Sequence, residues 1–158
     1  MKFINKLALF LLVTSLFACQ NNSANNAQSE QEAEEKVWSE MMAIHDEVMP
    51  KMSTINSLSQ MIKKPLATDP PPADTIAAVF EKALADLETA EEGMWDWMNQ
   101  LQKLNKLRAT KSHEEIMTYL NAEKQKVQKV RSDMLNSIQA AAILAKVPAG
   151  STPQSQEK

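Results

Sequence analysis

Residues 37–62 read VWSEMMAIHDEVMPKMSTINSLSQMI, and their apolar members recur at intervals of three and four. The recurring positions are Val37, Met41, Ile44, Val48, Met52, Ile55, Leu58 and Ile62. Because an α-helix turns once in about 3.6 residues, this spacing places them on one helical face. The stretch therefore predicts an amphipathic helix. Pro50 should kink that helix, because proline lacks a backbone donor and clashes with the preceding turn.

Two later stretches have the same periodicity. The second contains Ile76, Phe80, Ala83, Leu87, Met94, Trp97 or Met98, Leu101 and Leu104, and the third contains Ile116, Leu120, Val127, Val130, Met134, Ile138 and Leu144. Pro65 and the run Asp69-Pro70-Pro71-Pro72 cannot continue the first helix. Asp74 or Thr75 can cap the second helix. Ser112-His113-Glu114-Glu115 fits a capping box, which predicts the start of the third.

Three helices of about 30 residues each, joined by short connections, predict an all-α fold. The simplest arrangement is an antiparallel up-down-up three-helix bundle of long helices. Aromatic residues make up only 5% of the chain, so the core is thin. The alternative is therefore an elongated coiled coil that completes its core by dimerising.

The N-terminal residues predict an export signal. Lys2 and Lys6 precede an apolar stretch of about 12 residues. A membrane-spanning helix needs about 20. The stretch ends in Leu16-Phe17-Ala18-Cys19, which resembles the lipobox of bacterial lipoproteins. This resemblance implies lipidation of Cys19, cleavage after Ala18 and acylation of the new amino group. Phe17 departs from the pattern, because a smaller residue usually occupies that position.

Cys19 is the single cysteine of the chain. It cannot form an internal disulfide, and a lone thiol in an exported protein usually has a specific purpose. A secretory signal that happens to end in a cysteine is the alternative reading. Two or more acyl chains give stable residence in a bilayer. We therefore expect a lipid anchor in the cell envelope, at the outer membrane and facing the periplasm.

The composition divides the chain into four parts. Residues 1–18 form the signal peptide, and residues 19–29 carry the lipidated cysteine and a flexible tether rich in Gln, Asn and Ser. Residues 30–147 form the helical bundle domain, which Pro148 ends. Residues 148–158 are a polar tail expected to be disordered, because such a composition buries too little apolar surface to offset chain entropy.

The net charge argues against nucleic acid as a partner. The whole chain has a formal net charge of -3, and removal of Lys2 and Lys6 with the signal takes it to -5. Binding to nucleic acid relies on a basic face that neutralises phosphates, and none stands out. Most enzyme signatures are missing as well. The two glycines form no phosphate-binding loop, and neither histidine has serine and carboxylate neighbours at a recognisable spacing. The sequence therefore predicts a protein that is not an enzyme and needs no cofactor.

One group of residues could still bind a metal ion. Met41, His45 and Met49 are spaced four residues apart on the first helix. If the chain turns back near residue 69, His45 lies opposite about residue 93, close to Met94 and Met98. Thioether and imidazole ligands together suit copper(I) or silver(I), whose softness favours sulfur. The same residues also fit core packing, because methionine fills irregular gaps between helices. Hydrogen bonding of His45 to Asp46, Glu47 or Glu123 fits that second interpretation.

The three tryptophans are candidates for an interaction surface. Trp38, Trp95 and Trp97 are too many and too close together for one narrow apolar stripe, so at least one should face a partner or cover an end of the bundle.

Two segments resemble a known group of proteins. They are Met42-Ala43-Ile44-His45-Asp46-Glu47-Val48-Met49-Pro50-Lys51-Met52 and Met94-Trp95-Asp96-Trp97-Met98. Together they resemble uncharacterised helical lipoproteins of Bacteroidota, some of which carry the label of viral A-type inclusion proteins. The resemblance implies a helical periplasmic or outer-membrane lipoprotein of unknown role, and it supplies no catalytic residues.

Two functions follow as expectations. The first is a membrane-anchored, non-catalytic helical lipoprotein that acts as a protein-interaction or structural module and engages an envelope protein or a second copy of itself. The second is a soft-metal binding protein that uses His45, Met41 and Met49, with Met94 and Met98. A carrier of small molecules between the helices has less support in the sequence.

Overall fold

A computed structural model describes residues 18–69 and 71–146. Its elements are α2 (Ala18–Val48), the short 3-10 helix η2 (Met49–Lys51), α3 (Met52–Leu66), α4 (Asp74–Gln100), α5 (Leu104–Arg108) and α6 (His113–Leu144). These ranges contain no strand. Most of the expected export signal (residues 1–17) and the expected C-terminal tail lie outside the described residues.

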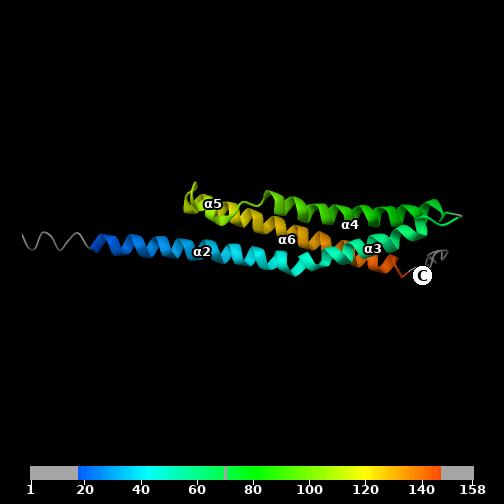
Figure 1. Ribbon diagram of the computed structural model, residues 1–158, viewed down its shortest axis with the longest axis horizontal. Coiled ribbons are helices and arrows are strands. Elements are labelled where there is room, and N and C mark those ends of the chain that lie inside the picture. Colours follow the sequence, from blue (N-terminus) through cyan, green and yellow to red (C-terminus); the bar gives the residue numbers. More distant parts are fainter. Residues whose placement is uncertain (1–17, 70, 147–158) are drawn as a thin grey trace, which may run out of the picture.

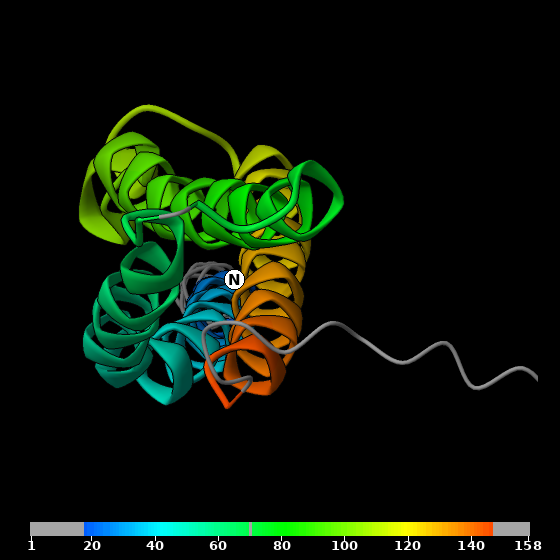
Figure 2. The ribbon, with the colours of Figure 1, turned by 90° about the vertical axis from the view of Figure 1, so that its right-hand side faces the viewer.

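The helices form an elongated bundle. The chain runs along the long axis in α2 and α3, returns in α4 and runs outward again in α6 (Figure 1). α6 packs against both α2 and α4, whereas α3 packs against α4 and α6. Viewed along the long axis, α3, α4 and α6 surround a common core (Figure 2). The predicted all-helical bundle of three long segments is thus confirmed.

The core follows a seven-residue repeat. The buried positions that follow it are Glu34, Met41, Val48, Ile55 and Ile62 on α2 and α3, Phe80, Leu87 and Met94 with Ala83, Ala90 and Trp97 on α4, and Leu120, Val127, Met134 and Ala141 with Ile116, Glu123 and Ser137 on α6. Leu58 of α3 is buried outside this repeat. A repeat of seven keeps one seam of each helix facing its neighbours, as in a coiled coil. The repeat therefore explains why the long helices pack together, in α2 from Glu34 onward.

Pro50 produces the break that the sequence predicts. The backbone passes through η2 between α2 and α3, and Pro50 lies within its first two residues. Val48 and Ile55 stay buried on either side, so the seven-residue repeat continues across the break. Pro65 is a less effective terminator than we expected. It lies inside the last turn of α3, which ends at Leu66.

The second apolar stripe does not form one continuous helix. α4 ends at Gln100, and Leu104 begins the separate helix α5. The backbone is extended at Leu101, and the amide that the break frees at Gln102 donates a hydrogen bond to Tyr119 Oη at 2.8 Å. In this arrangement α5 buries both of its leucines before the chain enters α6.

Of the two helix caps predicted from the sequence, the structure confirms one. Ser112 and Glu115 form the predicted capping box at the N-terminus of α6, where each side chain satisfies a backbone amide of the other. The N-terminus of α4 differs. Its cap residue is Ala73, without a side-chain hydrogen bond, and Asp74 lies in the first turn instead of capping it. A carboxylate there still favours the helix, because the first turn carries a partial positive charge.

The segment expected to be a flexible tether is helical. α2 begins at Ala18 and continues through residues 19–29. Residues 18–36 contain neither glycine nor proline, and extension of an existing helix needs no new nucleus. Gln28 also donates a hydrogen bond to Glu32 one turn later, at 3.0 Å. Among the described residues, none of the helices has both the length and the apolar character needed to cross a bilayer.

Candidate functional site

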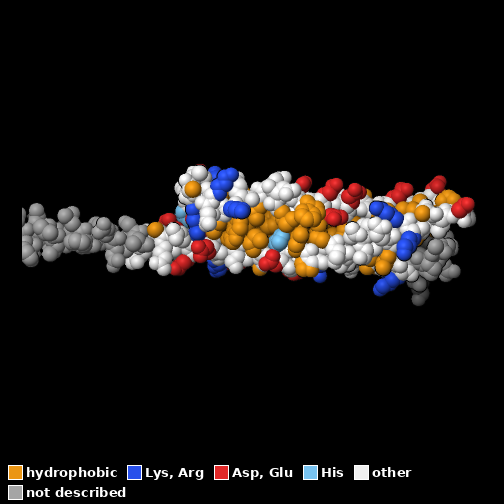
Figure 3. Space-filling model, in the orientation of Figure 1, with side chains coloured by type: hydrophobic (Ala, Val, Ile, Leu, Met, Phe, Trp, Pro, Cys, Tyr) orange, Lys and Arg blue, Asp and Glu red, His pale blue; other side chains and the backbone are white. Residues whose placement is uncertain are grey.

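An apolar strip lies on the face between α2 and α4. We define it as Trp38 and Met42 of α2 and Met49 of η2, together with Trp95 and Met98 of α4. Trp38, Met42, His45 and Met49 recur at i, i+4, i+7 and i+11, which places them on one helical face. Because His45 contacts Met98, this face of α2 is directed towards α4. Figure 3 shows hydrophobic side chains as a band across the middle of the molecule, around a histidine.

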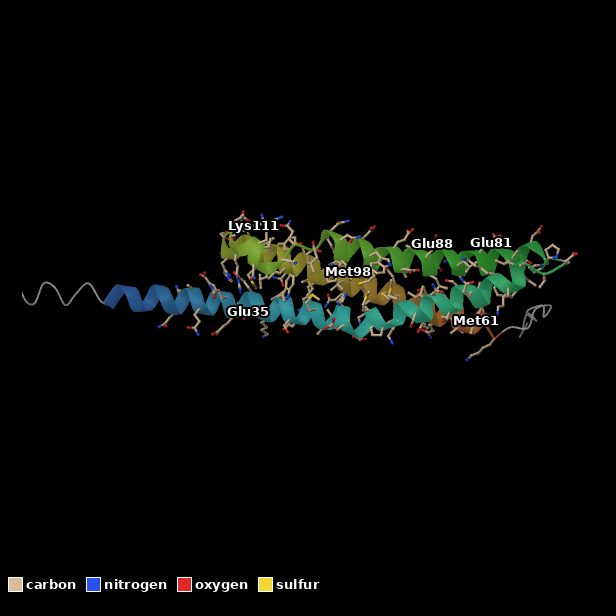
Figure 4. All side chains as sticks on the ribbon, viewed as in Figure 1. Glu35, Met61, Glu81, Glu88, Met98 and Lys111 are labelled. Atoms are coloured by element: carbon tan, nitrogen blue, oxygen red, sulfur yellow. The ribbon has the colours of Figure 1, made fainter. Side chains whose placement is uncertain are left out.

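His45 connects the two helices in the middle of this strip. Its Nε2 atom lies 3.2 Å from Met98 Sδ, and its Nδ1 atom lies 2.8 Å from Asp46 Oδ1. The imidazole ring also contacts the Trp97 ring, with 5.9 Å between the centroids and planes tilted by 35°. The His45 side chain is 16% exposed. Met98 projects from α4 towards α2 in Figure 4. The ring is thus held on three sides and remains open to solvent.

Of the four methionines predicted as metal ligands, not all lie beside the His45 side chain. Met41 and Met94 are fully buried in the hydrophobic core. Met49 and Met98 are partly buried at the edge of the core, and Met98 is the methionine whose sulfur is in contact with His45. The sequence-based register had placed His45 opposite residue 93, about one helical turn from its observed neighbours.

The three tryptophans have different environments. Trp95 is 47% exposed, and Trp38 is partly buried at the edge of the core. Trp97 is buried, so its assignment to an interaction surface is wrong. The seven-residue repeat shared with Ala83 and Ala90 turns Trp97 into the core. Its Nε1 donor has no hydrogen-bond partner among the described residues.

A buried carboxylate was missed in the sequence. Glu34 is 4% exposed, and Arg108 Nε donates to its Oε2 at 2.7 Å. His113 Nδ1 lies 2.9 Å from Glu34 Oε1. Arg108 also contacts the Glu35 carboxylate and the Gln31 carbonyl. These contacts join α2, α5 and α6 at one end of the bundle. Glu34 precedes Met41 by seven residues, and this spacing in the sequence could have predicted that Glu34 is buried.

The electrostatics of this cluster favour the ionised carboxylate. Burial by itself raises the pKa of Glu34, but the hydrogen bonds from Arg108 and His113, together with their charges, lower it below the usual 4.5. The hydrogen bond with Glu34 raises the pKa of Arg108. Since the carboxylate is nearly enclosed, its partners balance a charge that would otherwise be costly to bury.

We expect Glu34→Gln to destabilise the fold by about 2 kcal/mol at pH 6, because Arg108 and His113 lose an ionised acceptor. The folded-state pKa of Glu34 is lowered, so its stabilisation is complete above about pH 4.5 and is lost as the pH falls through the folded-state pKa. Urea unfolding at pH 6 and at pH 3 measures both effects. The difference between wild type and variant should shrink at pH 3.

Glu40→Gln is the matched control for this prediction. Glu40 pairs with Lys124 across the same two helices, α2 and α6, but its side chain is 42% exposed. Exposed pairs contribute little, so this variant should have nearly wild-type stability at pH 6. Equal losses for Glu40→Gln and Glu34→Gln would show that burial of Glu34 is unimportant.

A second buried carboxylate lies on α6. Glu123 is buried, and its Oε1 accepts a hydrogen bond from Lys126 at 2.7 Å. That hydrogen bond raises the pKa of Lys126. The Oε2 atom has no partner among the described residues. His45 is therefore in contact with Asp46, one of the three carboxylates predicted as its hydrogen-bond partner. Glu123 instead accepts a hydrogen bond from Lys126 of its own helix.

A pocket of about 400 Å³ lies between α4 and α6. Its lining includes Asp86, Lys129 and Asp133. Lys129 pairs with Asp133 at 2.6 Å, and Asp86 pairs with Lys82 at the same distance. The charges at this cavity are therefore engaged in pairs along the exposed helix surfaces.

None of the protein families, curated proteins or solved structures compared with the chain matches it. The resemblance to helical lipoproteins of Bacteroidota thus stays a prediction.

Proposed function

We propose that the protein is a lipid-anchored, non-catalytic helical module of the cell envelope that binds an amphipathic helix of another protein through the apolar strip. The observation that carries this proposal is the strip itself. It combines an exposed tryptophan, a second tryptophan at the edge of the core, and three partly buried methionines on one face.

The chemistry of the strip supports a protein partner. Tryptophan and methionine are enriched in protein interfaces, and tryptophan is frequent among the residues that contribute most of the binding energy. Trp95 exposes 47% of its surface, which is a large apolar area to leave in water. Methionine side chains are unbranched and flexible, so a surface rich in them can adapt to its partner.

The dimensions of the strip support a helical partner. Trp38 of α2 and Met49, the first residue of η2, are separated by about 17 Å along the helix axis, or roughly three helical turns. A partner helix that places apolar residues at i, i+3 or i+4 and i+7 presents a stripe of comparable length. α6 lies between α2 and α4 and packs against both, so a helix bound on the strip would be supported from beneath.

The membrane anchor determines where such a partner would be met. Acylation of Cys19 would hold the chain at the bilayer, in our proposal at the outer membrane and facing the periplasm. About 18 Å of helix separate Cys19 from Gln31, whose carbonyl accepts a hydrogen bond from Arg108 at the end of the bundle. A helical spacer of this length would hold the bundle at a defined distance from the bilayer surface.

We expect Trp38→Ala to weaken partner binding by about thirtyfold, which corresponds to the loss of about 2 kcal/mol at a tryptophan that anchors an interface. The lipidated protein is isolated from detergent-solubilised membranes, and the copurified protein is identified and quantified by mass spectrometry. Its affinity for wild type and variants is then measured by calorimetry.

Two further variants make this test selective. Trp95→Ala removes an exposed side chain of the strip and should weaken binding without a loss of stability. Met61→Ala is the matched control, because Met61 is 51% exposed on α3 and lies outside the strip. Equal binding by all three variants would contradict the proposal. If the bound partner is a second copy of the chain, sedimentation velocity will show a dimer that Trp38→Ala dissociates.

A further inference from the structure

The contact between His45 and Met98 brings two electron-pair donors together. Asp46 Oδ1 lies 2.8 Å from His45 Nδ1, and an ionised carboxylate can only accept a hydrogen bond. We therefore assign the proton of the neutral ring to Nδ1. The Nε2 atom then carries a lone pair, and it lies 3.2 Å from the thioether sulfur of Met98.

Two lone pairs at this distance require a positive charge between them. Thioether sulfur has no proton to donate. The pair is consequently stable either when Nε2 is protonated and donates to sulfur, or when a cation binds to both atoms. A carboxylate that accepts from the other ring nitrogen is also the usual outer partner of a metal-bound histidine, because it orients the ring and raises its basicity.

We infer that His45 Nε2 and Met98 Sδ form a binding site for a soft monovalent cation, copper(I) in the first place. Imidazole and thioether select such ions over hard cations, which prefer oxygen ligands. Zinc(II), which like copper(I) has a filled d shell, forms bonds of about 2.0 Å to imidazole nitrogen and 2.3 Å to thiolate sulfur, and we take these lengths as a guide for copper(I). One ion in a bent arrangement therefore fits the observed separation of the two atoms.

The surroundings complete the site. The Trp97 ring lies 5.9 Å from the imidazole centroid, and an indole face near a cation stabilises it and excludes water. Met49, the first residue of η2, lies about one turn after His45 and offers a second thioether. The His45 side chain is 16% exposed, which leaves an approach for the ion.

This inference is independent of the proposed function. Metal binding depends on the Met98 sulfur atom, whereas partner binding depends on the apolar surface. Met98→Leu removes the sulfur, and it preserves most of the side-chain volume and its apolar character. It should therefore abolish the metal site and leave the fold intact.

The test is a competition for copper(I) against a chromogenic chelator. The full chain is used in detergent with any free thiol of Cys19 blocked by N-ethylmaleimide, because a thiolate would itself bind copper(I). We expect one ion per chain. Loss of a residue that only supports a metal ligand lowers metal affinity by about 10- to 100-fold. Met98 and His45 are the proposed ligands themselves, so Met98→Leu and His45→Ala should each weaken copper(I) binding at least about tenfold. Met61→Leu should bind like wild type.

Silver(I), which is diamagnetic and stable in air, locates the ion. In protein labelled with ¹³C at the methionine methyl groups, addition of one equivalent should shift the Met98 resonance and leave that of Met61 in place. The inference is overturned if wild type withdraws no copper(I) from the chelator. It is equally overturned if Met98→Leu binds as tightly as Met61→Leu, or if silver(I) shifts the exposed methionine as much as Met98.

Discussion

Substitution of Cys19 by serine is expected to abolish lipid attachment and processing completely. Transfer of the lipid to this position requires a thiol, because the bond formed is a thioether, and a serine hydroxyl cannot replace it. The lipobox-like Leu16-Phe17-Ala18-Cys19 ends at the single cysteine of the chain, so no other residue can take over. Stable membrane residence depends on two or more acyl chains, and the variant should lose this anchor entirely.

Metabolic labelling with a palmitate analogue measures this effect in a bacterial host that processes lipoproteins. Wild type should carry the label and begin at Cys19, whereas Cys19→Ser should be unlabelled and retain residues 1–18. Ser23→Ala is the control, since it changes a nearby polar residue outside the lipobox and should be processed normally. A labelled Cys19→Ser chain, or an unlabelled wild type, would refute the proposed anchor.

Leu120→Ala is expected to cause the largest loss of folding stability, about 2–5 kcal/mol. Leu120 is fully buried on α6, the helix that packs against α2, α3, α4 and α5. Truncation removes apolar contacts within the core and leaves a cavity that long, regularly spaced helices cannot close by local movement. In a core with so few aromatic residues, one such cavity is a large fraction of the total stability.

Urea unfolding followed by circular dichroism gives this value. Ile143→Ala is the matched control, because Ile143 lies on the same helix and is 64% exposed. Substitutions at such exposed positions usually change stability by less than about 0.5 kcal/mol. A loss below about 1 kcal/mol for Leu120→Ala would mean that α6 is not the central packing element of the bundle.

The helical fold could be read from the sequence because its signals are local. Apolar residues at intervals of three and four define the helices, and Pro50 and the Ser112–Glu115 capping box define a break and a start. Each depends on residues within one or two turns. The break after Gln100 has no such signal. It allows Leu104 and Leu107 to be buried against the end of the bundle, which is a property of the tertiary arrangement.

Residues 19–29, which were predicted to be a flexible tether, show where composition misleads. The Gln, Asn and Ser content of residues 19–29 is typical of disordered linkers, yet these residues continue α2. Composition describes a segment in isolation, whereas a segment attached to a packed helix only has to extend it. The same reasoning explains why Pro65 is tolerated, since it lies in the last turn of α3.

The candidate site was predicted in part. Turning the chain near residue 69 brought His45 within about one turn of Met98, its observed neighbour. Glu34 was missed because a glutamate among many on a polar segment looks solvent-exposed, and only its place in the seven-residue repeat marks it as buried. Its partner Arg108 is distant in sequence and is brought close by α5.

The central claim is that the apolar strip binds a partner while the protein is anchored at the membrane. Site-specific photo-crosslinking in cells tests it most directly, with the crosslinking amino acid placed at Met42 of the strip or at Ser132, an exposed residue of α6. We predict that Met42 gives one discrete crosslinked protein, which Trp95→Ala in the same chain abolishes, and that Ser132 gives none. The same product from both positions, or no product from Met42, would contradict the claim.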